Sequence, residues 1–155
     1  MKICMIGTGY VGLVSGACFS ELGNDVICSD IDSDKIEKLN NGIVPIYEPG
    51  LEEIFKRNFT QGKLKFSSDI SLSIKKSDII FICVGTPTKN NKADLKYVFN
   101  VIKSIKSNLN RYKIIVTKST VPVTTGDKIE KILIKQKNKK LVDVVSNPEF
   151  LREGE

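Results

Sequence analysis

The sequence contains no histidine among its 155 residues, and none of its four cysteines stands in a Cys-x-x-Cys pair. Structural zinc sites are built from cysteine and histidine ligands at such short spacings, so no metal site is expected. The absence of histidine also removes the commonest general base. Any catalysis by this chain must therefore use carboxylates, lysines, hydroxyl groups or a bound cofactor.

Long apolar runs are also missing. No segment approaches the roughly 18 apolar residues of a membrane-spanning helix. The N-terminus lacks the basic stretch and the small-residue cleavage site of a signal peptide. We therefore expect a cytoplasmic protein with no membrane association. In that compartment we expect reduced, buried thiols that behave as small hydrophobes at Cys4, Cys18, Cys28 and Cys83.

The net charge is +6, from 24 basic and 18 acidic residues, and much of the excess lies between Lys96 and Lys140. This lysine-rich half could be a nucleic-acid patch or a set of solvated helix faces. Its lysines are spaced along predicted helices without interleaved aromatic residues, which favours solvated faces and no nucleic-acid partner. A positive field could still attract an anionic nucleotide.

The first twelve residues carry the clearest local signal. Ile3–Ile6 is a short apolar run of strand type, and a helix-length apolar segment begins at Val11. Between them lies a Gly-x-Gly-x-x-Gly motif, which in this setting is typical of a dinucleotide-binding turn. Its glycines allow a tight turn, a close pyrophosphate and close helix packing, in that order. We predict cofactor contacts from the motif and the helix N-terminus, at Gly7, Gly9, Tyr10, Val11 and Gly12.

Asp30 ends the second predicted strand, Asp25–Asp30, and follows Gly12 by 18 residues. A carboxylate about 20 residues after the motif is typically the acceptor for the ribose hydroxyls. Such a carboxylate also repels a 2′-phosphate, so NAD is favoured over NADP. Lys35 is either a plain exposed helix lysine or a flank of the adenosine ribose.

Strands alternate with helices along the whole chain, which predicts an α/β fold with a doubly wound, mainly parallel, six-stranded Rossmann sheet in the order 3-2-1-4-5-6. The predicted strands are 3–6, 25–30, 63–67, 77–84, 112–117 and 141–145. The predicted helices are 11–22, 32 or 33 to 41, 51–59, 69–76, 94–109, and 124 or 125 to 136. We expect a polar loop between Thr88 and Lys92, and a basic turn over Lys137–Lys140.

Ligands of such sheets bind beyond the carboxyl ends of the strands. Gly85-Thr86-Pro87 follows the central strand and either lays flat backbone against the nicotinamide ribose or is an ordinary turn. Ser119 and Thr120 follow the next strand as adjacent hydroxyls, or as a helix cap. Asn147–Glu153 follows the last strand, and its place at this edge favours a functional reading of its charged residues.

Five segments, in this order, resemble motifs of the UDP-glucose/GDP-mannose dehydrogenase family: 2–13, 46–51, 85–88, 118–123 and 147–154. The resemblance covers the whole chain and is greatest to the members that oxidise UDP-glucose. It implies a double oxidation of the sugar C6 alcohol, through an aldehyde to a carboxylate, with two NAD. It also implies a Rossmann domain followed by a connecting helix and a C-terminal domain.

The resemblance further implies roles for individual residues. NAD contacts are implied for Val11, Asp30, Lys35, Thr86, Thr120 and Glu153. The UDP-sugar site is implied along Glu149, Phe150, Leu151, Arg152 and Glu153. Thr120 would help to position water, and Glu149 would act in proton transfer or hydrolysis.

The family's nucleophilic cysteine, with its lysine, asparagine and aspartate partners, belongs to sequence beyond residue 155. We therefore expect an NAD-binding domain over residues 1–155 that cannot complete the oxidation alone, from a parent enzyme that forms a homodimer or larger assembly. Other readings are a domain acting on GDP-mannose or a UDP-N-acetyl sugar, and a non-catalytic NAD-binding module. On the first motif alone, 3-hydroxyacyl-CoA dehydrogenases also remain, although the later motifs argue against them.

Overall fold

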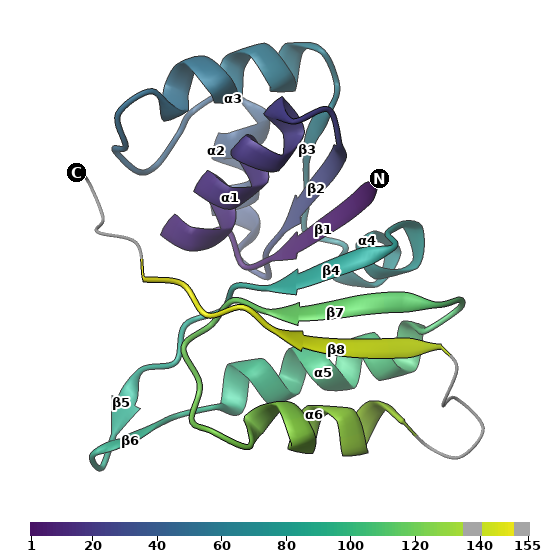
Figure 1. Cartoon of the computed structure of the whole chain (residues 1–155). Helices are drawn as coiled ribbons and strands as arrows, with labels where there is room; N and C mark the ends of the chain where they lie inside the picture. The colour runs from purple at the N-terminus through teal and green to yellow at the C-terminus, as the bar shows by residue number, and fades with distance from the viewer. Residues whose placement is uncertain (135–140, 151–155) are drawn as a thin grey trace.

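The computed structural model describes residues 1–134 and 141–150. Its centre is a six-stranded parallel sheet in the order β3-β2-β1-β4-β7-β8 (Figure 1). The strands are β1 Lys2–Ile6, β2 Asp25–Ser29, β3 Leu64–Ser67, β4 Ile79–Ile82, β7 Lys113–Thr117 and β8 Val142–Ser146. Numbered within the sheet alone this is the order 3-2-1-4-5-6, so the predicted fold class and strand order are confirmed.

Helices cover both faces of the sheet (Figure 1). They are α1 Tyr10–Glu21, α2 Ser33–Asn40, α3 Leu51–Thr60, α4 Ile70–Lys76, α5 Lys96–Asn108 and α6 Thr125–Leu133. Residues of α1, α2 and α3 pack in one apolar cluster, and residues of α4, α5 and α6 in a second. The strands alternate between the two, since Ile3 and Met5 face the first while Cys4 and Ile6 face the second. No helix within the described ranges is long and apolar enough to cross a membrane.

Helix starts follow the capping residues closely. Asp32 caps α2 by accepting a hydrogen bond from Lys35 N at 3.0 Å, which decides between the two starts left open by the sequence. Asp69 caps α4 as predicted. The N-cap of α5 is Leu95, one residue after the predicted Asp94, although Asp94 Oδ1 still accepts a hydrogen bond from Lys96 N. α6 ends at Leu133 with Ile134 as its C-cap, earlier than the predicted end at Gln136. The predicted turn over Lys137–Lys140 lies outside the described residues.

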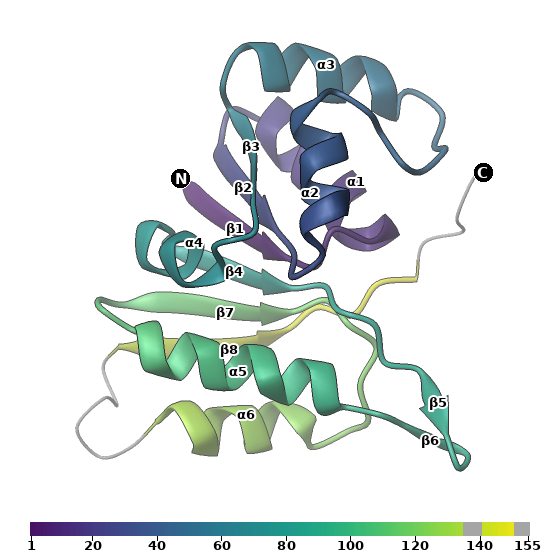
Figure 2. The same ribbon diagram turned by 180° about the vertical axis from the view of Figure 1, so that it is seen from behind.

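The expected polar loop after the central strand is instead a small antiparallel hairpin, β5 Thr88–Lys89 and β6 Lys92–Ala93. Asn90 and Asn91 form its tip with positive φ angles of 51° and 57°. Asparagine tolerates this left-handed region better than most residues, so the pair closes a two-residue hairpin turn. Figure 2 shows the hairpin extending beyond the carboxyl edge of the main sheet, away from its strands.

The prediction of four buried thiols is wrong at one position. Cys4, Cys28 and Cys83 are buried, whereas Cys18 is exposed on α1. The buried face of α1 comprises Gly12, Leu13, Gly16, Ala17 and Ser20. Cys18 lies on the opposite face of α1 and is therefore exposed to solvent.

Candidate functional site

The glycine motif forms the junction between β1, α1 and β4. Gly7 has a φ of +103°, and a Cβ there would lie 2.6 Å from the carbonyl oxygen of Cys83. A Cβ on Gly12 would lie 1.8 Å from the carbonyl oxygen of Gly7. Both positions therefore require glycine, the first for conformation and for space, the second for space alone. The loop is held tightly against the ends of two strands.

The middle glycine of the motif, Gly9, differs from Gly7 and Gly12 because it faces open space rather than backbone. No described protein atom lies within 4 Å of a Cβ built on Gly9. Gly9 is also the N-cap of α1, which has no side-chain cap and no acidic residue in its first turn. Open space in front of uncapped helix N–H groups suits an anion, because the helix dipole favours negative charge there. The residues present therefore fit the pyrophosphate of a dinucleotide.

Asp30 lies directly after β2 and contacts this loop. Its Oδ2 accepts hydrogen bonds from Thr8 N and Thr8 Oγ1, both at 2.8 Å, and its Oδ1 accepts one from Asp32 N at 3.2 Å. Lys35 Nζ lies 3.8 Å from Oδ2. Burial acts to raise the pKa of Asp30, but these hydrogen bonds and the lysine outweigh it, so the pKa lies below its ordinary value. Oδ1 keeps room for a further donor, such as a ribose hydroxyl.

Thr8 is a residue that the sequence reasoning missed. It occupies the variable position between the first two glycines and is only 1 % exposed. Both of its donors serve Asp30, so Thr8 fixes the carboxylate against the loop. The Gly-x-Gly-x-x-Gly motif allows any residue at this position, so the motif could not predict that Thr8 holds Asp30.

We expect Asp30 to make the domain sensitive to acid. Its pKa is lowered in the folded state, so its stabilising contribution is present above its unfolded pKa of about 3.9 and is lost as the pH falls through the folded pKa. In urea titrations at pH 6, the free energy of unfolding of the wild type should exceed that of an Asp30→Asn variant by about 1.5–3 kcal/mol, the scale of hydrogen bonds to a charged group. The difference should shrink below about pH 4.

Asp25→Asn is the matched control for this experiment. Asp25 begins the same strand, and its carboxylate makes no hydrogen bond or ion pair with the described residues. At this exposed position the replacement should leave the unfolding free energy at pH 6 within about 0.5 kcal/mol of the wild type. An Asp30→Asn variant that kept the wild-type acid dependence would contradict the prediction.

A pocket of about 240 Å³ lies where the carboxyl ends of the central strands meet the start of α1. It brings together three stretches that are far apart in the sequence, following β1, β4 and β7, with a residue that follows β8 (Figure 1). Its lining is Gly9, Tyr10, Val11, Cys83, Val84, Gly85, Thr86, Lys118, Ser119, Thr120 and Glu149. Most of the predicted nicotinamide-side residues thus share one pocket, while Pro87 is not among its lining residues.

The hydroxyl groups of this pocket are partly engaged with backbone. Ser119 Oγ donates to Val84 O at 2.6 Å, and Thr86 Oγ1 donates to Thr120 O at 2.9 Å. These bonds join the turn after β4 to the turn after β7. Ser119 and Thr86 therefore shape the pocket wall and can accept, rather than donate, a further hydrogen bond.

Glu149 enters the pocket from the segment after β8. Its Oε2 lies 2.5 Å from Lys118 Nζ, and its Oε1 accepts a hydrogen bond from Phe150 N at 2.9 Å. The side chain of Phe150 itself is 82 % exposed. The other three residues predicted for the sugar site, Leu151, Arg152 and Glu153, lie outside the described residues.

Cys83 lines the same pocket but is no nucleophile. Burial raises the pKa of its thiol to about 12, against a smaller opposing effect of the Lys118 charge. The reactive form of cysteine is the thiolate, so this thiol stays protonated and inert near neutral pH.

A second hollow, of about 290 Å³, lies on the other side of Gly7 and Asp30, against α4 and α5. Its lining adds several residues that sequence reasoning did not select, among them Ile31, Ile70, Tyr97 and Asn100. The two hollows share Val84 at the end of β4. The glycine loop therefore separates two recesses, as a ligand with two halves joined by a pyrophosphate requires.

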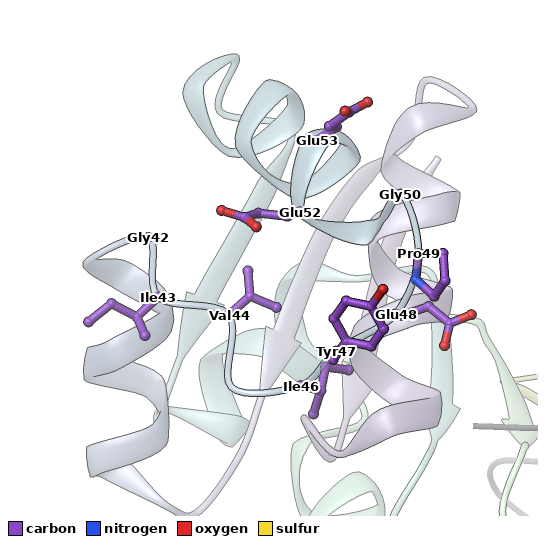
Figure 3. A pocket seen from close by; sticks show the side chains of 10 residues that line it. All are labelled: Gly42, Ile43, Val44, Ile46, Tyr47, Glu48, Pro49, Gly50, Glu52 and Glu53. Carbon is purple, nitrogen blue, oxygen red and sulfur yellow. The ribbon is translucent and has the colours of Figure 1, made fainter. Parts of the chain in front are cut away.

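A third hollow, of about 450 Å³, lies between the Gly42–Gly50 connection and α3 (Figure 3). Three glutamates line it, Glu48, Glu52 and Glu53, which makes it unsuited to a pyrophosphate. The Gly42–Gly50 connection contacts the start of α1. Tyr10 OH donates a hydrogen bond to Tyr47 O at 2.9 Å and also bonds the Glu48 carboxylate. Figure 3 shows Glu48 and Glu52 pointing away from each other.

The whole chain, residues 1–155, matches the family model described as the UDP-glucose/GDP-mannose dehydrogenase family, NAD binding domain. The chain belongs to this family. It is the family's NAD-binding domain, and NAD is the cofactor of that domain.

Individual relatives agree with this assignment. The chain is 56% identical over 155 residues to the UDP-glucose 6-dehydrogenase TuaD of Bacillus subtilis, covering 99% of this chain and 34% of that one. It is 50% identical over 156 residues to a UDP-glucose 6-dehydrogenase of Rhizobium meliloti, covering 99% and 36%. The chain thus spans about a third of the length of the curated relatives that it matches.

Solved structures share the fold closely. A UDP-glucose dehydrogenase from Pyrobaculum islandicum superposes with a TM-score of 0.89 at 35% identity, covering 99% of this chain and 37% of that one. A GDP-mannose dehydrogenase from Pseudomonas aeruginosa, in a ternary complex, superposes with a TM-score of 0.90 at 37% identity and the same coverage.

Proposed function

We propose that the protein carrying this domain is an NAD-dependent nucleotide-sugar 6-dehydrogenase that converts UDP-glucose to UDP-glucuronate. The observation that carries the proposal is the pocket after the central strands. It combines the uncapped start of α1 and the space before Gly9 with the carboxylate of Glu149. The identity of 56% to the UDP-glucose 6-dehydrogenase of Bacillus subtilis supports UDP-glucose as the substrate.

The proposed cofactor contacts divide into three groups. Gly7, Gly9, Tyr10, Val11 and Gly12 would hold the pyrophosphate, while Asp30 and Lys35 would bind the adenosine ribose beside the recess of α5. The nicotinamide side would lie against Gly85, Thr86, Pro87, Ser119 and Thr120. Glu153 is proposed as a further NAD contact from the resemblance alone.

Oxidation of an alcohol releases a hydride, which NAD accepts when bound, and a proton. Residues 1–155 contain no histidine, so a proton acceptor supplied by this domain must be another group. Glu149 is the proposed acceptor, because its carboxylate lies in the same pocket as the turn after β4. Phe150, Leu151, Arg152 and Glu153 would continue the sugar site, and Thr120 would position the water of the hydrolytic step.

We further propose that residues 1–155 are the cofactor-binding domain of a longer chain, whose other parts supply the nucleophilic cysteine and a dimer or larger assembly. A domain that covers 34% of its relative supports this division. The four free thiols support a cytoplasmic location, since reduced cysteines are usual there.

The deciding experiment follows NADH formation by the full natural protein with UDP-glucose, GDP-mannose or a UDP-N-acetyl sugar. We expect two NADH per UDP-glucose and a marked preference for that sugar. A preference for another nucleotide sugar would overturn UDP-glucose as the substrate but would still support an NAD-dependent sugar oxidation. Calorimetric NAD binding without NADH formation from any of these sugars would instead identify a non-catalytic NAD-binding module.

A further inference from the structure

Lys118 occupies a position that the backbone fixes on two sides. Its N–H donates to Ile82 O of β4 at 2.9 Å, and its carbonyl oxygen accepts from Glu149 N at 3.3 Å. The residue thus bridges the central strand and the segment after β8. The starting point of its side chain beside the pocket is therefore fixed.

The ammonium group of Lys118 makes two contacts, both within the pocket region. Nζ lies 2.5 Å from Glu149 Oε2 and donates to Asn147 Oδ1 at 3.2 Å. The side chains of Lys118 and Glu149 are only 11% and 21% exposed. The pair is largely withdrawn from water, in contrast to the exposed pair of Lys56 and Glu52, at 63% and 70%.

An ion pair in such a place is costly to desolvate, and surface pairs contribute little to stability. The geometry of the Lys118–Glu149 pair, however, fixes the position of the Glu149 carboxylate. Phe150 N holds one oxygen of Glu149 and Lys118 Nζ holds the other, so the plane of the carboxylate is set from both sides. Lys118 also lines the pocket beside Gly85 and Thr86.

We propose that Lys118 is the positioning residue for Glu149, holding its carboxylate oriented toward the substrate side of the nicotinamide pocket. This inference rests on the proposed nucleotide-sugar oxidation. Lys118 touches Glu149 and Asn147 rather than reacting atoms, and it acts on the reaction through Glu149. The role requires a cation at this position, and not lysine specifically.

The test uses the full natural protein with UDP-glucose and NAD. Lys118→Met roughly keeps the length of the side chain and removes the charge. It should lower kcat about 30-fold, since misplacing a catalytic group by about 1 Å can cost up to roughly 100-fold. KM for UDP-glucose should change less than about 3-fold. Lys118→Arg should recover most of kcat. Equal kcat in Lys118→Met and wild type, or a Lys118→Arg variant as impaired as Lys118→Met, would overturn the inference.

Two further measurements distinguish a positioning role of Lys118 from a purely structural role. They also distinguish failure of this inference from failure of the proposed function. Lys65→Met, at an exposed lysine of β3, is the matched control and should keep wild-type kcat. In thermal melts, Lys118→Met and Glu149→Gln should each lower Tm, and the double variant should lower it by less than the sum, because each single change strands one charge. Additive Tm shifts would overturn the pairing, whereas an inactive wild type would overturn the proposed function while the melts still test the pair.

Discussion

Replacing Gly12 with alanine is expected to abolish folding of the domain, whereas alanine at Gly9 is expected to leave the fold intact and weaken NAD binding. A Cβ at residue 12 would lie 1.8 Å from Gly7 O, 3.0 Å from Gly7 C and 3.2 Å from Cys83 Cβ. Two of these neighbours are backbone atoms of a loop packed between strands, so they cannot move away cheaply. The cost should exceed about 4 kcal/mol, a large part of the roughly 5–15 kcal/mol that stabilises a domain.

Gly9 provides the matched position within the same motif. Its φ of −73° and ψ of −169° suit alanine, and its Cβ would meet no described protein atom within 4 Å. The methyl group would instead occupy the space proposed for the pyrophosphate. Loss of one hydrogen bond to a charged group costs about 1.5–3 kcal/mol, which corresponds to roughly 10- to 150-fold weaker NAD binding.

Thermal melts followed by circular dichroism and calorimetric NAD titrations of both variants would check these expectations. A Gly12→Ala protein that melts with the wild type would show that the contact between α1 and the loop is looser than described. A Gly9→Ala protein that binds NAD as the wild type does would remove the pyrophosphate from the start of α1.

Asp30→Ala is expected to weaken NAD binding about 100-fold, equivalent to about 2.7 kcal/mol, and to raise the affinity for NADP relative to NAD. The change removes the acceptor proposed for the ribose and also frees Thr8 N and Thr8 Oγ1, which support the pyrophosphate loop. It also removes the charge that repels a 2′-phosphate. Lys35 Nζ, now 3.8 Å from Asp30 Oδ2, would become available to that phosphate.

Two companion variants separate these effects in calorimetric titrations with NAD and NADP. Thr8→Val removes the hydroxyl donor but keeps the Asp30 carboxylate, so it should weaken NAD binding much less than Asp30→Ala. Adding Lys35→Ala to Asp30→Ala should cancel the gain for NADP. An Asp30→Ala protein with wild-type NAD affinity would contradict the assignment of the ribose to this carboxylate.

The parts of the fold that were predictable are those encoded by neighbouring residues. The alternation of buried strands and amphipathic helices predicted the strand order, and side chains such as Asp69 marked helix starts. The thiol of Cys18 was misplaced because α1 is apolar or small on nearly every side, so its periodicity does not show which face is outward. The hairpin at Asn90 and Asn91 was missed because its two-residue strands have no alternation to detect.

The residues of the candidate site that come directly after strands could be predicted from the sequence. The carboxyl edge of a parallel sheet gathers these segments, so the sequence alone predicts that Gly9, Thr86 and Thr120 lie together. Contacts between side chains of different segments were not predictable. The pair of Lys118 and Glu149 depends on how the segment after β8 folds over β7, and the recess at Tyr97 depends on how α5 packs.

The β5–β6 hairpin gives the domain an uneven capacity for evolutionary change. Thr88–Lys92 is exposed throughout and hangs clear of the sheet (Figure 2). Lengthening a surface loop costs little, since closure entropy rises only slowly with the number of residues. The tip can therefore gain or lose residues at little cost in stability, while Gly7 and Gly12 admit no side chain without a clash with backbone. The hairpin begins a few residues after Thr86, which lines the pocket, so the length of this segment can change near the pocket without disturbing the core.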